Sequence, residues 1–128
     1  MTLETGSWEL WAGGDLSLVL DVDPHVAFAY LVREGGGMLC SVWVCNLPGP
    51  LPDEDDEEAL PVVANAFVLP GATAPASLDA LEMIVTPTRW VLSWPGGRSV
   101  LSATSTLGWS SAVGADSPFA KPLEELPI

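Results

Sequence analysis

Apolar and polar residues alternate with a period of two along most of this chain, whereas helical spacing of apolar residues is scarce. The clearest example is residues 16–22, where four large apolar side chains share one face and Ser17 and Asp21 lie opposite. The same alternation predicts further strands over residues 7–11, 25–33, 38–46, 83–86, 88–94 and 98–105. Residues 38–46 are almost continuously apolar, which indicates a central strand that is buried on both faces.

Clusters of glycine and proline separate these predicted strands at short intervals. The strongest turn signals are Gly13-Gly14-Asp15, Asp23-Pro24, Gly35-Gly36-Gly37 and Pro95-Gly96-Gly97. Short strands joined by tight turns are typical of an antiparallel meander. We therefore expect a mainly β fold, a small sandwich or half-barrel, in which residues 1–128 form a single β-rich domain with at most one or two short helices.

Three segments leave the type of element open. Residues 25–33 favour a strand, but Asp23 and Pro24 could also begin a helix there as N-cap and first helical residue. Residues 62–69 are either a short strand or an extended segment, and residues 78–82 could form one helical turn.

Two proline-containing segments lie outside the predicted sheet. Residues 47–61 are expected to form an acidic, proline-rich loop, because proline cannot donate a hydrogen bond to a sheet ladder. Residues 110–128 are expected to form an extended C-terminal segment that lies across the body, anchored by Phe119 and Leu123. Lys121, the single lysine, is expected to pair with an acidic residue and hold this segment in place.

The charge of the chain narrows the class of partner. Seventeen acidic residues stand against four basic ones, which gives a formal net charge of −13. A protein with this net charge repels nucleic acid and anionic membrane surfaces, and it attracts basic proteins. The sequence also lacks a signal peptide and any apolar run long enough to span a membrane, so we expect a cytoplasmic protein.

The acidic charge is most concentrated in six consecutive residues of the 47–61 loop. These are Asp53, Glu54, Asp55, Asp56, Glu57 and Glu58. The first interpretation is a solvated loop, because like charges in a row repel one another. The second is a docking surface for a cationic partner. A calcium loop is the third, although the run contains none of the glycines that shape such loops.

Six tryptophans provide the other candidate binding residues. Trp8, Trp43 and Trp90 are expected in the core. The odd spacing of Trp8 and Trp11 predicts that they lie on opposite faces of a strand, so that one of them is less buried. Trp11 or Trp94 is therefore a candidate for an exposed patch that binds a partner.

Two cysteines, Cys40 and Cys45, lie in one predicted strand. Five strand residues separate their Cα atoms by about 16 Å, whereas a disulfide requires less than about 7 Å. We therefore expect two free thiols, which fits a reducing cytoplasm. The odd spacing of the two residues also predicts that their side chains point to opposite faces.

The residues that catalysis would require form no recognisable set. His25, the single histidine, follows Pro24 at a predicted turn, which is a poor place for a preorganised base. Asp21 and Asp23 share a strand face, but nothing in the pattern marks either as a buried acid. The sequence contains no phosphate-binding loop, dinucleotide motif or metal-ligand spacing. We therefore expect no enzymatic activity, no catalytic residues, no cofactor and no metal.

Three segments resemble a family of small bacterial proteins: SVWVCNLPGP at 41–50, ANAFVLP at 64–70 and LGWSSAVGADSPFAKPL at 107–123. In that family a VWxxN strand end precedes a proline-rich loop, and a GWS…SPxAKPL-like segment closes the chain. The resemblance carries no activity over to this chain. It singles out Asn46, Asn65, Gly108, Trp109, Ser110, Pro118 and Lys121. Asn46 and Asn65 are interpreted as side chains that cap backbone groups.

Taken together, these patterns favour a non-catalytic protein-binding module. An immunity or inhibitor protein that neutralises a basic partner is the sharpest form of this hypothesis. Two alternatives stay open: an accessory protein of a bacterial assembly that uses exposed tryptophans, and a half-barrel that binds a small ligand.

Overall fold

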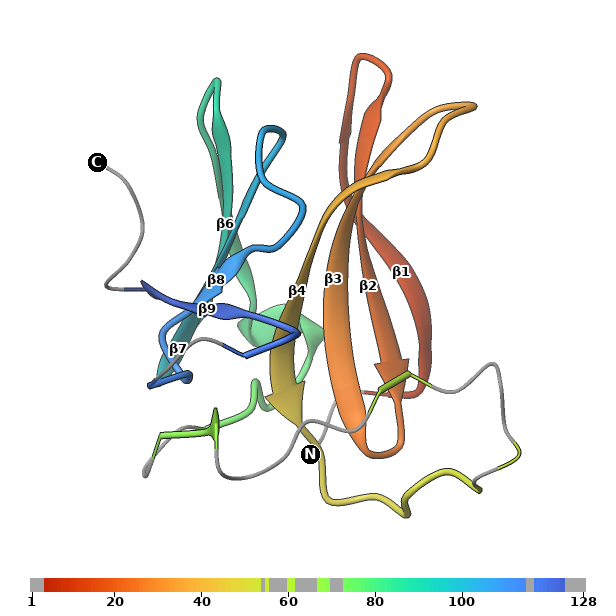
Figure 1. Cartoon of the computed structure of the whole chain (residues 1–128), viewed down its shortest axis with the longest axis vertical. Coiled ribbons are helices and arrows are strands. Elements are labelled where there is room, and N and C mark those ends of the chain that lie inside the picture. The colour runs from red at the N-terminus through yellow and green to blue at the C-terminus, as the bar shows by residue number, and fades with distance from the viewer. Residues whose placement is uncertain are drawn as a thin grey trace.

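Two β-sheets pack against each other in the computed structural model of the chain (Figure 1). The structure describes residues 4–53, 55, 60–61, 67–69, 73–114 and 117–123. The first sheet contains, in spatial order, β1 (Gly6–Gly13), β2 (Leu16–Asp23), β3 (Val26–Arg33) and β4 (Met38–Asn46). The second contains β5 (Glu82–Val85), β6 (Arg89–Trp94), β7 (Gly97–Ser102), β8 (Trp109–Ser110) and β9 (Lys121–Pro122). One short 3-10 helix, η2 (Leu78–Ala80), precedes β5.

The expected mainly β architecture is confirmed, with one difference in strand direction. Neighbouring strands are antiparallel from β1 to β4 and from β5 to β8. The last pair, β8 and β9, is parallel, with Trp109 opposite Lys121. The difference arises because the chain after β8 crosses over before it pairs, instead of turning back as a hairpin.

The tight turns lie where the glycine and proline signals predict them. Gly14, Gly35 and Gly96 have φ angles of 61°, 69° and 98°, a region that glycine adopts without steric cost. A short turn at residues 24–25 joins β2 to β3. Residues 25–33 are thus confirmed as a strand, β3, and the helical alternative is wrong. Packing on both faces explains this, because the first four residues of β3 are all buried.

Most of the remaining elements follow the sequence pattern. The predicted helical turn is present as η2, and Pro87 lies in the turn between β5 and β6. Strand β7 ends at Ser102 rather than at residue 105, because the Ser102 hydroxyl accepts a hydrogen bond from the amide of Thr104 and closes a turn there. Of the predicted segment 62–69, Val68 forms an isolated bridge with Val113, and residues 62–66 lie outside the described part.

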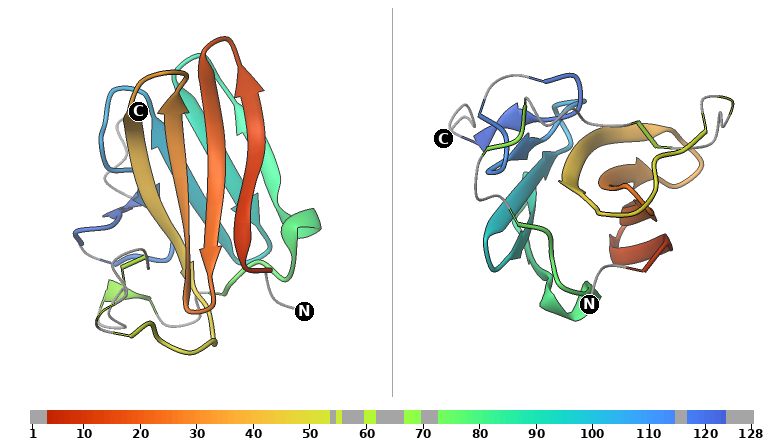
Figure 2. Two further views of the ribbon diagram at one scale, coloured as in Figure 1. Left: turned by 90° about the vertical axis from the view of Figure 1, so that its right-hand side faces the viewer. Right: turned by 90° about the horizontal axis from the view of Figure 1, so that it is seen from below.

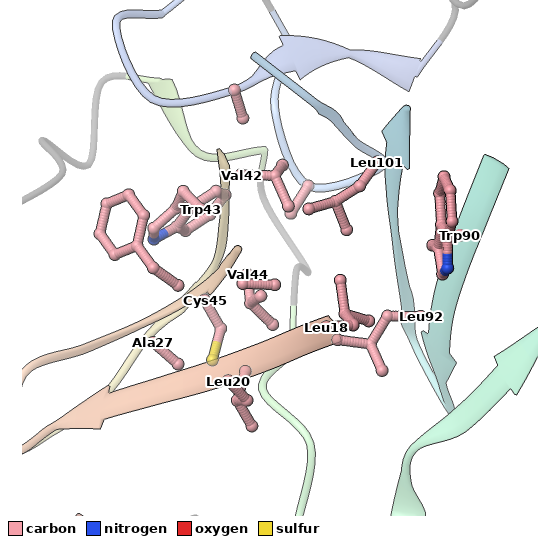
Figure 3. Packing of buried hydrophobic residues seen from close by; sticks show 14 of the residues in the cluster. Leu18, Leu20, Ala27, Val42, Trp43, Val44, Cys45, Trp90, Leu92 and Leu101 are labelled. Atoms are coloured by element: carbon pink, nitrogen blue, oxygen red, sulfur yellow. The ribbon is translucent and has the colours of Figure 1, made fainter. Parts of the chain in front are cut away.

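The core between the sheets contains leucines that point inward from both sides. Leu18 and Leu20 of β2 face Leu92 of β6 and Leu101 of β7 (Figure 3). Each of the four is at most 1% exposed. Burial of one such side chain stabilises the fold by about 1.5–3 kcal/mol. The leucine row predicted for residues 16–22 is therefore the central layer of the sandwich.

Strand β4 joins the two sheets at one side of the sandwich, next to β8 and β9 (Figure 1). Ser41 donates its amide to the carbonyl of Thr106 at 3.0 Å and accepts from the amide of Gly108 at 2.8 Å. The amide of Trp43 donates to the carbonyl of Phe119 at 2.9 Å. The prediction that residues 38–46 are buried on both faces is correct for residues 42–45. The predicted central position is wrong, because β4 is the last strand of its sheet and its outer edge bonds to these loop segments.

Two strand irregularities overturn predictions that rest on odd spacing. In β1 the register shifts between Glu9 and Trp11, so that Trp8 pairs with Leu20 and Trp11 with Leu18. Because these two leucines share a face, both tryptophans point to the core side. The extra residue of a bulge cancels the alternation that the spacing predicts.

The same effect occurs in β4. Cys40 pairs with Leu31 and Cys45 with Ala27, two residues on one face of β3. A register shift between Ala27 and Phe28 inserts one residue into β4. The two thiols therefore lie on the same face and not on opposite ones. Both are free, as expected.

Candidate functional site

The structure describes four of the eight predicted binding residues, namely Asp53, Asp55, Trp11 and Trp94. Asp53 and Asp55 are exposed. Glu54, Asp56, Glu57 and Glu58 lie outside the described residues. Trp11 is half-buried and contacts Trp90 edge to face, with ring centroids 5.6 Å apart.

Trp94 corrects the prediction of an exposed aromatic patch. It is only 6% exposed, and its indole N–H donates to the carbonyl of Thr73 at 2.8 Å. Trp43, Trp90 and Trp109 are buried as well, and Trp8 is half-buried. The indoles thus pack in the core and between the sheets. None of the six is in the exposed class, and Trp8 and Trp11 are the two that are partly accessible.

The acidic loop is held at both stems against the turn between β2 and β3. At its start, Leu47 donates its amide to the carbonyl of His25, and Gly49 donates to the carbonyl of Pro24, each at 2.8 Å. At its end, the amide of Leu60 donates to the Asp23 carboxylate at 2.9 Å. The His25 ring is 4% exposed and donates through Nε2 to the carbonyl of Leu60 at 2.9 Å.

This anchoring assigns roles that sequence reasoning missed. A Cβ at Gly49 would lie 2.1 Å from the carbonyl oxygen of Pro24, so the first stem requires glycine. His25 and Asp23 are candidates for chemistry by residue type, yet both bond to the backbone of the loop. The sequence NLPGP at residues 46–50 contains a signal for this anchoring. A glycine between two prolines indicates a place where another backbone segment approaches closely.

The two thiols are also part of the core. Burial raises the pKa of Cys45 to about 12. The pKa of Cys40 is raised as well, chiefly by burial, although a backbone hydrogen bond near Ser102 and the charge of Lys121 lower it in part. Because the reactive form of cysteine is the thiolate, both side chains are inert at neutral pH.

The outer face of the first sheet carries an aromatic pair beside two carboxylates. Tyr30 stacks on Phe28, with centroids 6.3 Å apart and an interplanar angle of 10°. Burial raises the pKa of Tyr30 to about 12, and the charges of Asp21 and Asp23 add to the rise. Asp21 also accepts a hydrogen bond from the hydroxyl of Ser7. These carboxylates are used in hydrogen bonds within the fold.

Lys121 and Phe119 hold the C-terminal segment against the body. Among the described residues, the Lys121 ammonium contacts the Trp109 ring, 5.2 Å from its centroid, and the Ser105 hydroxyl at 3.5 Å. In the described part of the chain its contact is therefore a cation–π contact, and the expected carboxylate is not among its partners there. Phe119 packs edge to face on Phe28 at 5.9 Å and is an anchor as expected.

Of the residues that the family resemblance singles out, Gly108 and Lys121 take part in the backbone bonds that connect β4 to the second sheet. Gly108 donates to Ser41 and accepts from the amide of Lys121, and a Cβ there would lie 2.4 Å from the carbonyl oxygen of Val100. The side-chain oxygen of Asn46 accepts from the indole N–H of Trp43 at 3.0 Å. Asn65 lies outside the described part. Gly108 thus connects β4 to the C-terminal segment through its bonds to Ser41 and Lys121.

Two half-open cavities lie at the surface of the described part. One, of about 210 Å³, is lined by Trp43, Asn46, Thr73 and other residues. The other, of about 400 Å³, is lined by residues that include Leu69, Ser111 and Leu123. The smaller of the two is below the volume of ordinary ligand pockets, and none of the described residues that line either cavity is charged.

The open side of the sandwich lies opposite β4, where β1 and β5 run along the two edges (Figure 2). The Trp11–Trp90 contact bridges the sheets on this side. Strand β5 exposes 56% of Ile84 and 39% of Val85, two of the most exposed large apolar residues described. Glu82 on the same strand and Asp79 in η2 are exposed too. This strand combines apolar side chains, acidic neighbours and a sheet edge.

Comparisons with known proteins add no family. No family model, curated protein or solved structure matches the chain. In the described part, no helix has the length and apolar character that crossing a bilayer requires. Three or more metal-ligating side chains do not come together anywhere in the residues 4–53 and 73–114 or in the shorter described stretches.

Proposed function

We propose that this chain is a non-catalytic protein-binding module whose partner is a basic protein. One observation carries the proposal: both stems of the 47–61 loop are bonded to the β2–β3 turn, while Asp53 and Asp55 between them are exposed. Anchored stems reduce the entropy that a loop loses on binding. A net charge of −13 adds long-range attraction for a cationic surface.

The sharpest form of the proposal is an inhibitor or immunity protein that neutralises a basic partner in the cytoplasm. Two buried, free thiols are compatible with a reducing compartment. The groups that chemistry would draw on, His25 and Asp23, support the loop through hydrogen bonds to Leu60. Binding would then act by covering a surface of the partner and not by modifying it.

The test compares two variants that each remove three charges. The loop variant replaces Asp53→Asn, Asp55→Asn and Glu57→Gln. The control variant replaces Glu4→Gln, Glu9→Gln and Glu34→Gln, which lie outside the loop. Wild type and both variants are immobilised and exposed to cell lysate at low and at high ionic strength, and retained proteins are quantified by mass spectrometry.

We expect wild type and the control variant to retain the same basic protein at low ionic strength. The loop variant should retain at least about tenfold less, because each lost contact with a cation weakens both encounter and complex. High ionic strength should release the protein from all three. Retention that is equal in the two variants and unaffected by salt would contradict the proposal.

A further inference from the structure

Within the described part of the chain, strand β5 leaves one row of backbone groups without a partner strand. The amide of Thr86 donates to the carbonyl of Arg89 at 2.9 Å, which marks residues 86 and 89 as a hydrogen-bonded pair. Such pairs alternate along an antiparallel ladder. Ile84, opposite Val91, is therefore bonded to β6. Met83 and Val85 direct their N–H and C=O groups away from β6, toward the edge.

No backbone group in the described part of the chain bonds to this edge. Strand β5 is the first strand in the order of its sheet, so its outer side ends the ladder. Two N–H donors and two carbonyl acceptors thus lie in one plane with the spacing of a strand. An extended segment placed alongside would satisfy all four.

Strand β1, at the other edge of the open side, shows how this protein protects an edge strand against the addition of a further strand. Strand β1 has a bulge between Glu9 and Trp11. Bulges are one feature by which proteins prevent strand addition at a sheet edge. Strand β5 has a continuous register with β6, and its last two residues, Ile84 and Val85, are β-branched and exposed.

The charge around β5 determines which segment fits. Glu82 begins the strand, and Asp79 lies one turn before it, both exposed. A second copy of this chain would bring another body of −13 against the same edge. Repulsion between two such bodies disfavours self-pairing, whereas lysine or arginine on an incoming segment would be attracted.

We propose that the β5 edge receives an extended, lysine- or arginine-bearing segment of the partner as an added β-strand. Backbone hydrogen bonds from Met83 and Val85 provide affinity, Ile84 packs against an apolar side chain of the segment, and Glu82 and Asp79 select its cations. This inference rests on the proposed function, since it assigns a second contact surface for the same basic partner.

The test uses a synthetic peptide of alternating lysine and valine as the probe, added to the full chain. Two counterparts serve as controls: one carries N-methyl groups on alternate residues, and the other has glutamate in place of lysine. Hydrogen exchange of single amides is followed by NMR. The lysine peptide should slow exchange at Met83 and Val85 by at least about tenfold, the equivalent of one hydrogen bond of about 1.4 kcal/mol.

Two variants separate the edge from the rest of the surface. Val85→Pro removes one outward N–H and leaves the ladder with β6 intact, because proline is tolerated where the N–H faces away from the sheet. Val85→Thr retains that N–H and the β-branched shape. We expect the proline variant to bind the lysine peptide at least about tenfold more weakly, and the threonine variant to bind within about threefold of wild type.

Several results would overturn the inference. Equal binding of the N-methylated peptide would exclude strand addition, and equal protection by the glutamate peptide would exclude selection by charge. The amides of Met83 and Val85 could also become protected from hydrogen exchange without peptide as the protein concentration rises. That result would assign the edge to a second copy of the chain. One result would separate the inference from the proposed function. If the lysine peptide does not slow exchange at Met83 and Val85, while the loop variant alone loses the basic protein from lysate, the inference fails and the proposed function stands.

Discussion

The two sheets of this protein are built from different kinds of contact. Four strands of eight or nine residues form the first sheet, and their spatial order follows the chain. The second sheet contains strands of two to six residues, ends in a parallel pair and has its last strand at Lys121–Pro122. A hairpin brings together residues that are close in sequence. The backbone bonds between the two sheets instead join segments more than 60 residues apart, such as Ser41 and Thr106.

From this difference we expect the first sheet to be stabilised mostly by its own hairpins, and the second sheet to depend on its joint with the first. The joint consists of backbone bonds from β4 to Thr106, Gly108 and Phe119. Gly108 contacts both sides, since it bonds to Ser41 and to Lys121. Three measurements separate the contributions of the two sheets.

Truncation of an inward leucine should have the largest effect. Leu20→Ala removes a side chain that is fully buried between the sheets and should lower the free energy of unfolding by about 4 kcal/mol. Met83→Ala, which truncates the one half-buried residue of β5 in the second sheet, should lower it by about 1 kcal/mol. Urea denaturation followed by circular dichroism measures both. Equal losses would mean that the two sheets contribute alike.

A methyl group at the joint should have the next largest effect. Gly108→Ala places a Cβ 2.4 Å from the Val100 carbonyl and 2.8 Å from Val42 Cβ, where neither neighbour has room to move. The loss in the free energy of unfolding should be about 3 kcal/mol. Gly37→Ala, in the β3–β4 turn with nothing within 4 Å of the new Cβ, should change it by less than about 0.5 kcal/mol.

Hydrogen exchange would show whether that loss is local. If the second sheet depends on the joint, its amides should exchange faster in Gly108→Ala while those of β2 and β3 keep their protection. Uniform loss of protection in both sheets would contradict the division drawn between them.

Alkaline pH provides the smallest of the three effects, through Cys45 of the first sheet. Because the pKa of Cys45 is raised from 9.0 to about 12, the folded state retains the thiol proton while the unfolded state loses it. The stabilisation is complete below pH 9 and is lost as the pH rises toward 12. At pH 11 this group alone should cost about 2.7 kcal/mol. Cys45→Ala should show a shallower fall between pH 9 and 11 than wild type; parallel curves would refute the assignment.

Local hairpins explain how much of the fold could be predicted from sequence. Alternation and turn residues predict the strands of the first sheet to within one or two residues at each end. Strands β8 and β9 could not be found, because two-residue strands have no periodicity and their pairing depends on a long-range crossover. The bulges at Trp11 and Cys45 were hidden too, since one inserted residue leaves the composition of a strand unchanged.

The candidate site was less predictable than the fold. Acidic residue types identify the 47–61 loop, but the bonds of Leu60 to His25 and Asp23 join residues 35 and 37 positions apart. Exposure at Ile84 depends on β5 being at an edge, which is a property of strand order and not of the residue. Residue type favours an exposed Trp94, whereas the carbonyl of Thr73 provides the partner that lets its indole be buried.

The contact between Trp11 and Trp90 has a practical consequence for observing this molecule. Two indoles at 5.6 Å and 68° are close enough to couple electronically, so their combined absorption depends on their mutual geometry. They lie across the open side of the sandwich, and Trp90 is directly opposite Val85 in the ladder. The protein therefore contains an intrinsic chromophore pair beside the β5 edge. Any segment that spreads or tightens that side would change its optical signal without a dye or a tag.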